Sequence, residues 1–291
     1  METTRTRADR CPGVFRPWAA EDGLLVRLRL IGGRIPVGAL IAVLDLAEEY
    51  GDGHVHTTLR ANLQLRALPG VEAGLDTSVV RALEATGLVP SPAHDLVRNV
   101  LVSPQTGLAG GQADLRPVAA ELDRRVRCSD LLAGLPGRFL FVLDDGRGDL
   151  IGHKSDLALV ALDATTAQVR VGEAWADVVA LEDAPARMVA LAEDFVRRRG
   201  EGPHAAWHVV ELAEPLGVPA SADPRTPQVR AALAFGPVPG GIHIPVGEAG
   251  IDRDWMDRAM RLTGATADQE FVITPWKGVL VPHSMCEEKQ E

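Results

Sequence analysis

Cysteine is scarce in this sequence, and its three copies stand far apart. They are Cys11, Cys128 and Cys286 in a chain of 291 residues, and no Cys-x-x-Cys pair occurs. This distribution excludes the dense disulfide framework that is typical of small secreted domains. It favours a protein of the reducing cytoplasm.

Long apolar runs and lysine are also lacking. No stretch of about eighteen apolar residues occurs, so the sequence predicts no transmembrane helix. The N-terminal residues 1–10 are polar and charged, without the apolar core of a secretory signal peptide. The net charge is −10, and the lysines are only Lys154, Lys277 and Lys289. Such an acidic chain is not expected to bind nucleic acid or an anionic membrane surface.

What is present begins with an α+β pattern over residues 11–90. Its order is strand, helix, strand pair and helix, at residues 24–30, 36–51, 54–68 and 76–87. Pro36 suits the first position of a helix, and Gly51 is placed to end that helix. The pattern predicts a small α+β sandwich.

Residues 91–216 predict a larger α+β domain. Strands are expected at residues 97–102, 138–143, 156–162 and 168–171, and helices at residues 115–126 and 184–199. The Asp144-Asp145-Gly146 run predicts a hairpin turn after its strand. Residues 205–212 fit either a strand or a helix, and residues 217–226 predict a linker rich in Pro, Ser and Asp.

A repeat of the first pattern follows at residues 227–283, before a short tail at residues 284–291. Residues 242–247 resemble residues 33–38, and a helix is expected after each. The strand pair at residues 272–282 resembles residues 56–66, with a threonine corner in both. The two units are predicted to exchange edge strands in a pseudo-twofold arrangement.

The corner of the first unit carries the clearest candidate site. Arg60, Asn62, Gln64 and Arg66 recur at every second position, which places them on one face of an extended chain. Guanidinium and amide donors on one face suit a ligand rich in carboxylates. The alternative is an ordinary solvated face of an antiparallel sheet.

Other candidates are single residues or pairs. Arg98 and Asn99 end an apolar strand, and their alternative role is to stabilise a turn. Arg138 precedes a strand, with a salt bridge to Asp144 or Asp145 as the alternative. Lys277 follows Trp276 and is placed to reach an anion. No metal site is expected, because the alternating pair His54 and His56 lacks a third ligand nearby. The His153-Lys154-x-Asp156 run fits an acid/base cluster or, as the alternative, a polar turn.

Five motifs occur in an order that resembles the sulfite/nitrite reductase superfamily, and most closely its precorrin-3B synthases. They are Cys-Pro-Gly at residue 11, Thr-Leu-Arg-Ala-Asn-Leu-Gln-Leu at 58, Arg-Asn-Val at 98, Leu-Pro-x-Arg-Phe at 135 and Thr-Pro-Trp-Lys at 274. The resemblance implies two ferredoxin-like half-domains in a pseudo-twofold arrangement around one larger α+β reductase-like domain. It also implies siroheme, or a related tetrapyrrole, and a four-iron four-sulfur cluster as cofactors.

The resemblance implies roles for particular residues. Arg60 and Arg98 match arginines that bind siroheme carboxylates, and Arg138 matches a basic residue of the substrate pocket, which makes it the catalytic candidate. Asn62, Gln64, Asn99 and Lys277 are the further cofactor-binding candidates. Leu140 stands where sulfite reductases of the family have a lysine, which favours a precorrin-like substrate over sulfite.

The cysteines depart from the family pattern. A four-iron cluster normally takes four thiolates, and none of the three cysteines lies in the family's ligand motifs. The second catalytic domain of the family is also expected to be missing from this chain. The sequence therefore predicts a precorrin-3B synthase-like oxidoreductase of cobalamin biosynthesis that is incomplete without a cluster-bearing C-terminal part. That part is expected either on a separate polypeptide or beyond an incomplete reading frame. The alternative is a non-catalytic tetrapyrrole-binding module or a truncated reductase-like remnant.

Overall fold

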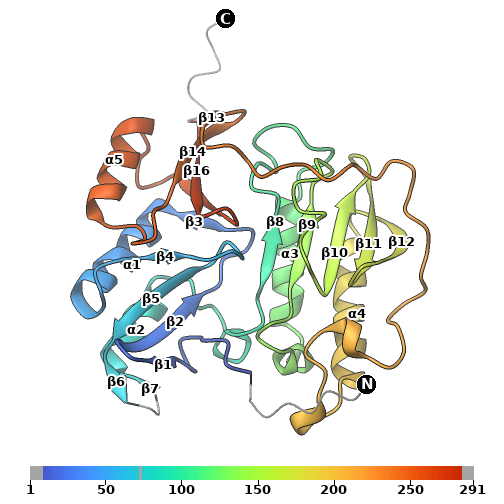
Figure 1. Ribbon diagram of the computed structural model, residues 1–291, viewed down its shortest axis with the longest axis horizontal. Helices are drawn as coiled ribbons and strands as arrows, with labels where there is room; N and C mark the ends of the chain where they lie inside the picture. The colour runs from blue at the N-terminus through green and yellow to red at the C-terminus, as the bar shows by residue number, and fades with distance from the viewer. Residues whose placement is uncertain (1–8, 72–73, 284–291) are drawn as a thin grey trace, which may run out of the picture. The chain divides into compact units, whose positions relative to one another are not determined.

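The computed structural model describes residues 9–71 and 74–283, which form two compact units. The paired-half unit contains Pro12–Asp95 and residues 232–283, and the mixed-sheet unit contains residues 9–11 and Leu96–Ala231 (Figure 1). The predicted tail at residues 284–291, with Cys286, lies outside the described residues. No described helix is long and apolar enough to cross a membrane.

The first half of the paired-half unit is an antiparallel sheet covered by two helices. Its sheet has the strand order β1-β2-β5-β4. The elements are β1 Trp18–Ala20, β2 Gly23–Leu28, β3 Arg34–Pro36, α1 Val37–Tyr50, β4 His56–Thr57, β5 Leu63–Leu68, the short hairpin β6 Gly70–Val71 and β7 Gly74–Leu75, and α2 Thr77–Ala85.

Helix α1 begins and ends where the sequence predicts. Pro36, with φ of −56°, precedes its first turn, and Gly51 follows its last turn. The amide of Gly51 donates to the carbonyl of Ala47 at 2.9 Å. A side chain at Gly51 would come within 2.7 Å of the carbonyl oxygen of Arg66, so the helix ends against β5 at a residue without one. The apolar face of α1 thereby covers the buried side of the sheet.

The second half repeats this plan. Its elements are β13 Gly236–Val238, β14 Gly241–Pro245, α5 Arg253–Thr263, β15 Glu270–Thr274 and β16 Gly278–Pro282. The carboxylate of Asp252 accepts a hydrogen bond from the amide of Trp255 at 2.7 Å and so caps α5. Gly264, with φ of +67°, ends the helix in the left-handed region.

The two halves exchange strands, as the pseudo-twofold prediction requires. Strand β3 of the first half pairs with β15, and Val55, next to β4, bridges to Ile251 of the second half. A helix follows each of the matched segments, residues 33–38 and 242–247, as predicted, but the two segments hold different places in their sheets. Strand β14 lies second in its sheet, the place that β2 holds in the first sheet. The two segments look alike because each leads toward a helix. Their strand partners differ: β14 pairs with β13 in a hairpin, whereas β3 pairs with β15 of the other half.

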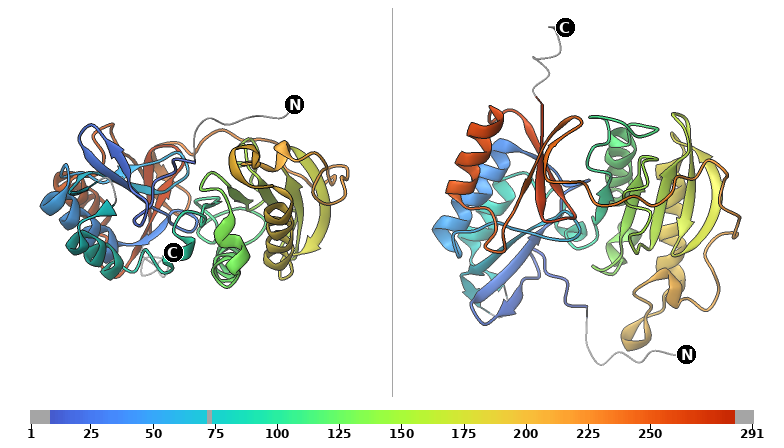
Figure 2. Two further views of the ribbon diagram at one scale, coloured as in Figure 1. Left: turned by 90° about the horizontal axis from the view of Figure 1, so that it is seen from below. Right: turned by 45° about the horizontal axis from the view of Figure 1, so that its top comes forward.

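The mixed-sheet unit contains one five-stranded sheet of order β12-β11-β10-β9-β8. Figure 2 shows α3 and α4 together on one face of that sheet. The elements are β8 Val100–Val102, α3 Arg116–Arg127, β9 Phe141–Asp144, β10 Leu157–Ala161, β11 Thr166–Val171, β12 Ala174–Ala180 and α4 Ala184–Arg198. Strand β12 was not predicted, and residues 205–212 contain only a single 3-10 turn, Val209–Glu211.

The predicted hairpin at Asp144-Asp145-Gly146 is wrong. Strands β8, β9 and β10 run parallel, so β9 does not turn back on itself. The connection, residues 145–156, instead runs from the end of β9 back to the edge of the sheet at which β9 begins, and β10 starts there. The linker predicted at residues 217–226 is held against the sheet, because the amide of Ala220 donates to the carbonyl of Trp175 at 2.8 Å.

Candidate functional site

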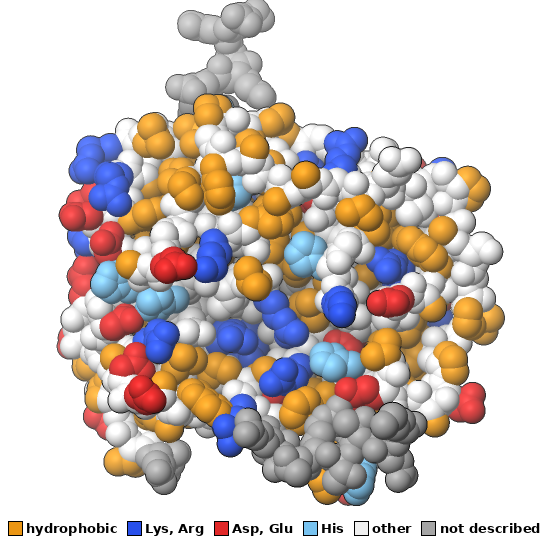
Figure 3. Space-filling model, in the orientation of Figure 1, with side chains coloured by type: hydrophobic (Ala, Val, Ile, Leu, Met, Phe, Trp, Pro, Cys, Tyr) orange, Lys and Arg blue, Asp and Glu red, His pale blue; other side chains and the backbone are white. Residues whose placement is uncertain are grey.

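The open face of the first sheet carries a row of polar side chains. In the strand register His56 of β4 lies opposite Gln64 of β5, and Gln64 lies opposite Arg27 of β2. All three are partly exposed, while their neighbours Leu63 and Leu28 are buried on the opposite face. Figure 3 shows Lys or Arg and His side chains gathered over these strands. The row presents guanidinium, amide and imidazole groups side by side.

The corner before β5 interrupts the predicted alternation. Ala61 has φ of +54°, a left-handed conformation that turns the chain. Leu59 is 66% exposed instead of facing the core. Asn62 is buried, and its side-chain oxygen accepts a hydrogen bond from the amide of Leu30 at 2.9 Å. The predicted continuous face of four residues is therefore wrong, because one left-handed residue changes the side on which later side chains lie.

The remaining members of that face lie on either side of this corner. Arg60 is partly exposed within it, and its amide donates to the hydroxyl of Thr58 at 3.3 Å. Arg66 is two positions after Gln64 on β5 and pairs with Asp22 at 3.2 Å. The row of His56, Gln64 and Arg27, together with Arg60, is therefore the candidate ligand-binding face, and a ligand role for Arg60 and Gln64 stays a prediction.

Lys277 occupies the equivalent corner of the second half. Its φ is +54°, the same as that of Ala61, and its side chain is exposed. The hydroxyl of Thr274 in this corner lies 2.9 Å from Nε2 of His243, which is buried. Burial lowers the pKa of His243. The corner is thus built on a buried imidazole, and Lys277 projects from it.

Arg98 and Asn99 lie in the mixed-sheet unit and are buried. Nε of Arg98 donates to Asp123 of α3 at 2.6 Å, and the two side chains are 8% and 10% exposed. The amide nitrogen of Asn99 donates to the carbonyl oxygens of Leu96, at 3.2 Å, and Gly137, at 3.0 Å. These contacts are those of the turn-stabilising alternative, and they join residue 99 to the segment before Arg138.

Arg138 stands at the surface of the same unit. Its guanidinium lies 5.1 Å from the ring centroid of Trp207 and 3.7 Å from a carboxylate oxygen of Asp9. The partner of Arg138 is therefore Asp9, and neither Asp144 nor Asp145, as the sequence alternative proposed. Its role as a substrate-binding cation stays a prediction.

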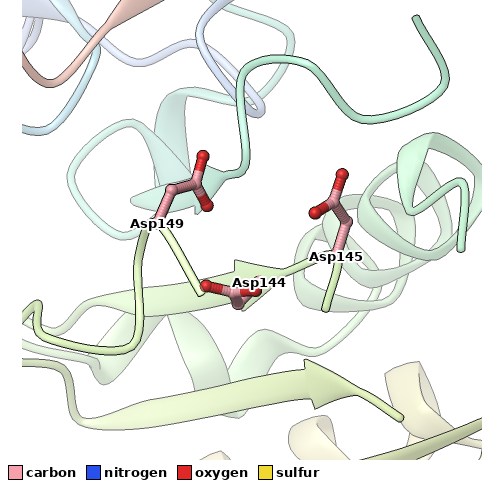
Figure 4. Close-up of side chains that lie close together, drawn as sticks. All are labelled: Asp144, Asp145 and Asp149. Atoms are coloured by element: carbon pink, nitrogen blue, oxygen red, sulfur yellow. The ribbon is translucent and has the colours of Figure 1, made fainter. Parts of the chain in front are cut away.

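The sequence interpretation missed a cluster of carboxylates after β9. Oxygens of Asp144, Asp145 and Asp149 lie within 4.8 Å of one another (Figure 4). Asp144 accepts hydrogen bonds from three backbone amides, those of Gly146, Gly148 and Leu150, at 2.8–2.9 Å. The two Asp residues before alternating glycines were the available signal, because a short carboxylate side chain readily accepts from amides of a following loop.

The charges of this cluster are only partly balanced. Arg147 donates to both oxygens of Asp145, at 2.8 and 2.6 Å, and Ser103 donates to Asp149 at 2.6 Å. Burial, and then the charge of Asp144, raise the pKa of Asp149 to about 7. Burial also raises the pKa of Asp144. The cluster fixes the loop that joins the parallel strands β9 and β10.

The cysteines do not fit a four-iron cluster held by this chain alone. Cys11 is partly exposed and Cys128 is exposed, and neither forms a disulfide bond. The whole sequence contains three cysteines, against the four thiolates that such a cluster normally takes. The guanidinium and amide groups of the open sheet face do fit a ligand with several carboxylates, because they present N–H groups. Nε2 of His56 instead lies 2.8 Å from a carboxylate oxygen of Asp52.

Comparison with known proteins agrees with the observed fold. Residues 19–73 match the family model described as the nitrite/sulfite reductase ferredoxin-like half domain. The chain is 30% identical over 171 residues to a precorrin-3B synthase of Sinorhizobium sp., covering 58% of this chain and 35% of that protein. It is 34% identical over 80 residues to a ferredoxin sulfite reductase of Synechococcus elongatus, covering 28% of this chain and 12% of that protein.

A solved structure shares the architecture. The NirA protein of Mycobacterium tuberculosis superposes with a TM-score of 0.66 at 17% identity, covering 95% of this chain and 60% of that one. The chain thus spans about a third of the first curated relative and 60% of the solved structure. The chain is therefore similar in fold, and over residues 19–73 in sequence, to proteins of the sulfite/nitrite reductase superfamily.

Proposed function

We propose that this chain is the tetrapyrrole-binding part of a precorrin-3B synthase-like oxidoreductase of cobalamin biosynthesis. The observation that carries the proposal is the open sheet face on which His56, Gln64 and Arg27 lie side by side. That face lies within the matched residues 19–73. Precorrins and siroheme carry many carboxylates, and N–H donors in a row suit such ligands.

The residues of this face would hold and orient the tetrapyrrole. Arg60, Arg27 and Gln64 donate hydrogen bonds to its carboxylates, and the sheet behind them keeps the three groups in register. A bound siroheme supplies redox chemistry that no side chain of the chain provides. The three cysteines of these residues are too few for a four-iron cluster, so the thiolates of such a cluster would come from outside these 291 residues.

A spectroscopic titration tests the proposal. Siroheme added to the purified chain is expected to bind saturably, and Arg60→Gln is expected to weaken binding about tenfold or more, because a charge-assisted hydrogen bond contributes about 1.5–3 kcal/mol. Arg81→Gln is the matched control, since Arg81 is exposed on α2, away from the sheet face. Absence of saturable binding, or equal affinity of both variants, contradicts the proposal.

A second candidate is a module that binds a tetrapyrrole without catalysing a reaction. The observation that favours it is the cysteine count, three in the whole sequence. The two candidates differ in one measurement. Reduction of bound siroheme by an electron donor in the presence of a cluster-bearing partner supports the oxidoreductase, and binding without reduction supports the module.

A further inference from the structure

A buried carboxylate and a surface imidazole form a pair in the mixed-sheet unit. Asp156 immediately precedes β10 and is 2% exposed. Its oxygens accept hydrogen bonds from the amides of Leu140, at 2.9 Å, and Val209, at 3.0 Å. Nδ1 of His208 lies 3.2 and 3.3 Å from the same two oxygens. The carboxylate therefore receives three donors in fixed positions.

This geometry selects one tautomer of His208. A carboxylate only accepts hydrogen bonds, so the ring nitrogen that faces it must carry the proton. In the neutral ring the lone pair then belongs to Nε2. The side chain of His208 is 37% exposed, whereas that of Asp156 is 2% exposed. A carboxylate that fixes the tautomer of a surface imidazole is the arrangement found in general acid and base catalysis.

A cation is attached to the same two segments of chain. Trp207 immediately precedes His208, and the guanidinium of Arg138 lies 5.1 Å from its ring centroid. Leu140, which donates to Asp156, is two residues after Arg138. Segments 138–140 and 207–209 thus carry the cation and the imidazole, and each segment donates one backbone amide to Asp156. Three charged groups lie beside these segments. Asp9 lies beside Arg138, Glu211 accepts from the amide of Trp207 at 2.7 Å, and Arg199 donates to the carbonyl of Ala206 at 2.9 Å.

We propose that His208 is a proton-transfer residue for an oxyanion bound at Arg138, with Asp156 as its positioning residue. The protonated ring gives the Nε2 proton to an oxygen of the anion, and the N–H bond electrons remain on Nε2 as the lone pair. A proton from water then restores the imidazolium. The inference goes beyond the proposed function, which does not involve Arg138, and takes Arg138 as the substrate cation that the sequence resemblance implies.

Nitrogen NMR of the full chain with labelled histidine tests the pair directly. Neutral His208 is expected to carry its proton on Nδ1 alone, and Asp156→Asn is expected to give a mixture of tautomers. His208→Gln assigns the resonance, and His204→Gln is the matched control, because His204 is exposed in the same unit. The wild-type measurement needs no variant, so it holds even if Asp156→Asn does not fold. A proton on Nε2 of the neutral wild-type ring overturns the proposal.

Sodium sulfite, used as the oxyanion probe, tests the link to Arg138. Addition of sulfite is expected to shift the Nε2 resonance of His208 in the wild type and not in Arg138→Gln, with His204 unchanged in both. A purely structural His208 would show no response, and an equal shift in Arg138→Gln would also refute the proposal. Neither measurement requires a tetrapyrrole. A failure of siroheme binding would therefore contradict the proposed function without affecting the test of His208.

Discussion

Substitution of Arg98, which forms an ion pair with Asp123, distinguishes a structural role of this arginine from the predicted role in cofactor binding. The two side chains are 8% and 10% exposed and lie 2.6 Å apart. Arg98→Met removes the charge but keeps much of the length of the side chain, and it leaves a buried carboxylate behind. Breaking a buried pair in this way costs about 3–5 kcal/mol of unfolding free energy.

We expect the loss of unfolding free energy to lie at the lower end of that range, because Arg127 also contacts Asp123. Its Nε lies 2.9 Å from the second oxygen of Asp123, so one cation remains after the substitution. We expect a loss of about 3 kcal/mol, which corresponds to a fall in melting temperature of about 6–12 °C for a chain of this size. Urea denaturation and thermal melting, followed by tryptophan fluorescence, measure both quantities.

Two further variants make the test specific. Arg127→Met removes the more exposed partner and is expected to cost under about 1 kcal/mol. Asp123→Leu combined with Arg98→Met replaces the pair by apolar groups and is expected to restore most of the lost stability. The reasoning is refuted if Arg98→Met leaves the unfolding free energy unchanged, and loss of siroheme binding at unchanged stability would instead establish the cofactor role.

Two other predictions concern the carboxylate cluster and the junction of the half-domains. The pKa of Asp149 is raised from its ordinary value of 3.8 to about 7, so the folded state holds the proton more tightly than the unfolded state. Stability from this group is therefore complete below the unfolded pKa and is lost as the pH rises to about 7, by up to about 1.4 kcal/mol per pH unit. Urea denaturation at several pH values should show a flatter dependence for Asp149→Asn, and an unchanged slope contradicts this account. Gly33→Ala should destabilise the paired-half unit by about 3 kcal/mol, because φ is +73° and the new carbon would lie within 2.1 Å of the Ile273 carbonyl. Gly53→Ala, with φ of +79° and open space around it, should cost only about 1 kcal/mol in thermal unfolding, and equal losses would contradict a tight junction at Gly33.

Local signals in the sequence predicted the elements well where a residue acts within its own segment. Pro36 and Gly51 bound α1 because each changes the backbone at its own position. The Asp144-Asp145-Gly146 run failed for the opposite reason. A turn sequence has the same local chemistry whether the next strand returns antiparallel or passes round to pair in parallel. Here the pairing of β9 with β8, far back in the chain, decides the outcome.

The prediction of one continuous face at residues 60–66 was wrong for a different reason. Period-two alternation assumes that every residue is extended, and a single left-handed residue breaks it. Ala61 gives no sequence signal of that conformation, since Gly and Asn are its usual carriers. The buried carboxylate–imidazole pair was equally invisible, because Asp156 and His208 are separated by 52 positions. The backbone amide of His153 donates to the carbonyl of Leu150 at 2.9 Å, as in the polar turn that was the alternative for this segment.

The repeated corner shows how one backbone plan serves two purposes in the halves. Ala61 and Lys277 both have φ of +54°, although a left-handed conformation costs roughly 1–2 kcal/mol for such residues. Both halves keep that cost, so the corner geometry itself must be required by the strand exchange next to it. In the first half, the hydroxyl of Thr58 accepts the amides of Arg60 and Asn62 and holds the donors of the open face. In the second half, Thr274 contacts buried His243, and the side chain that projects is Lys277. The fold therefore fixes where a corner side chain can project, and only the residue types decide which half presents donors to a ligand.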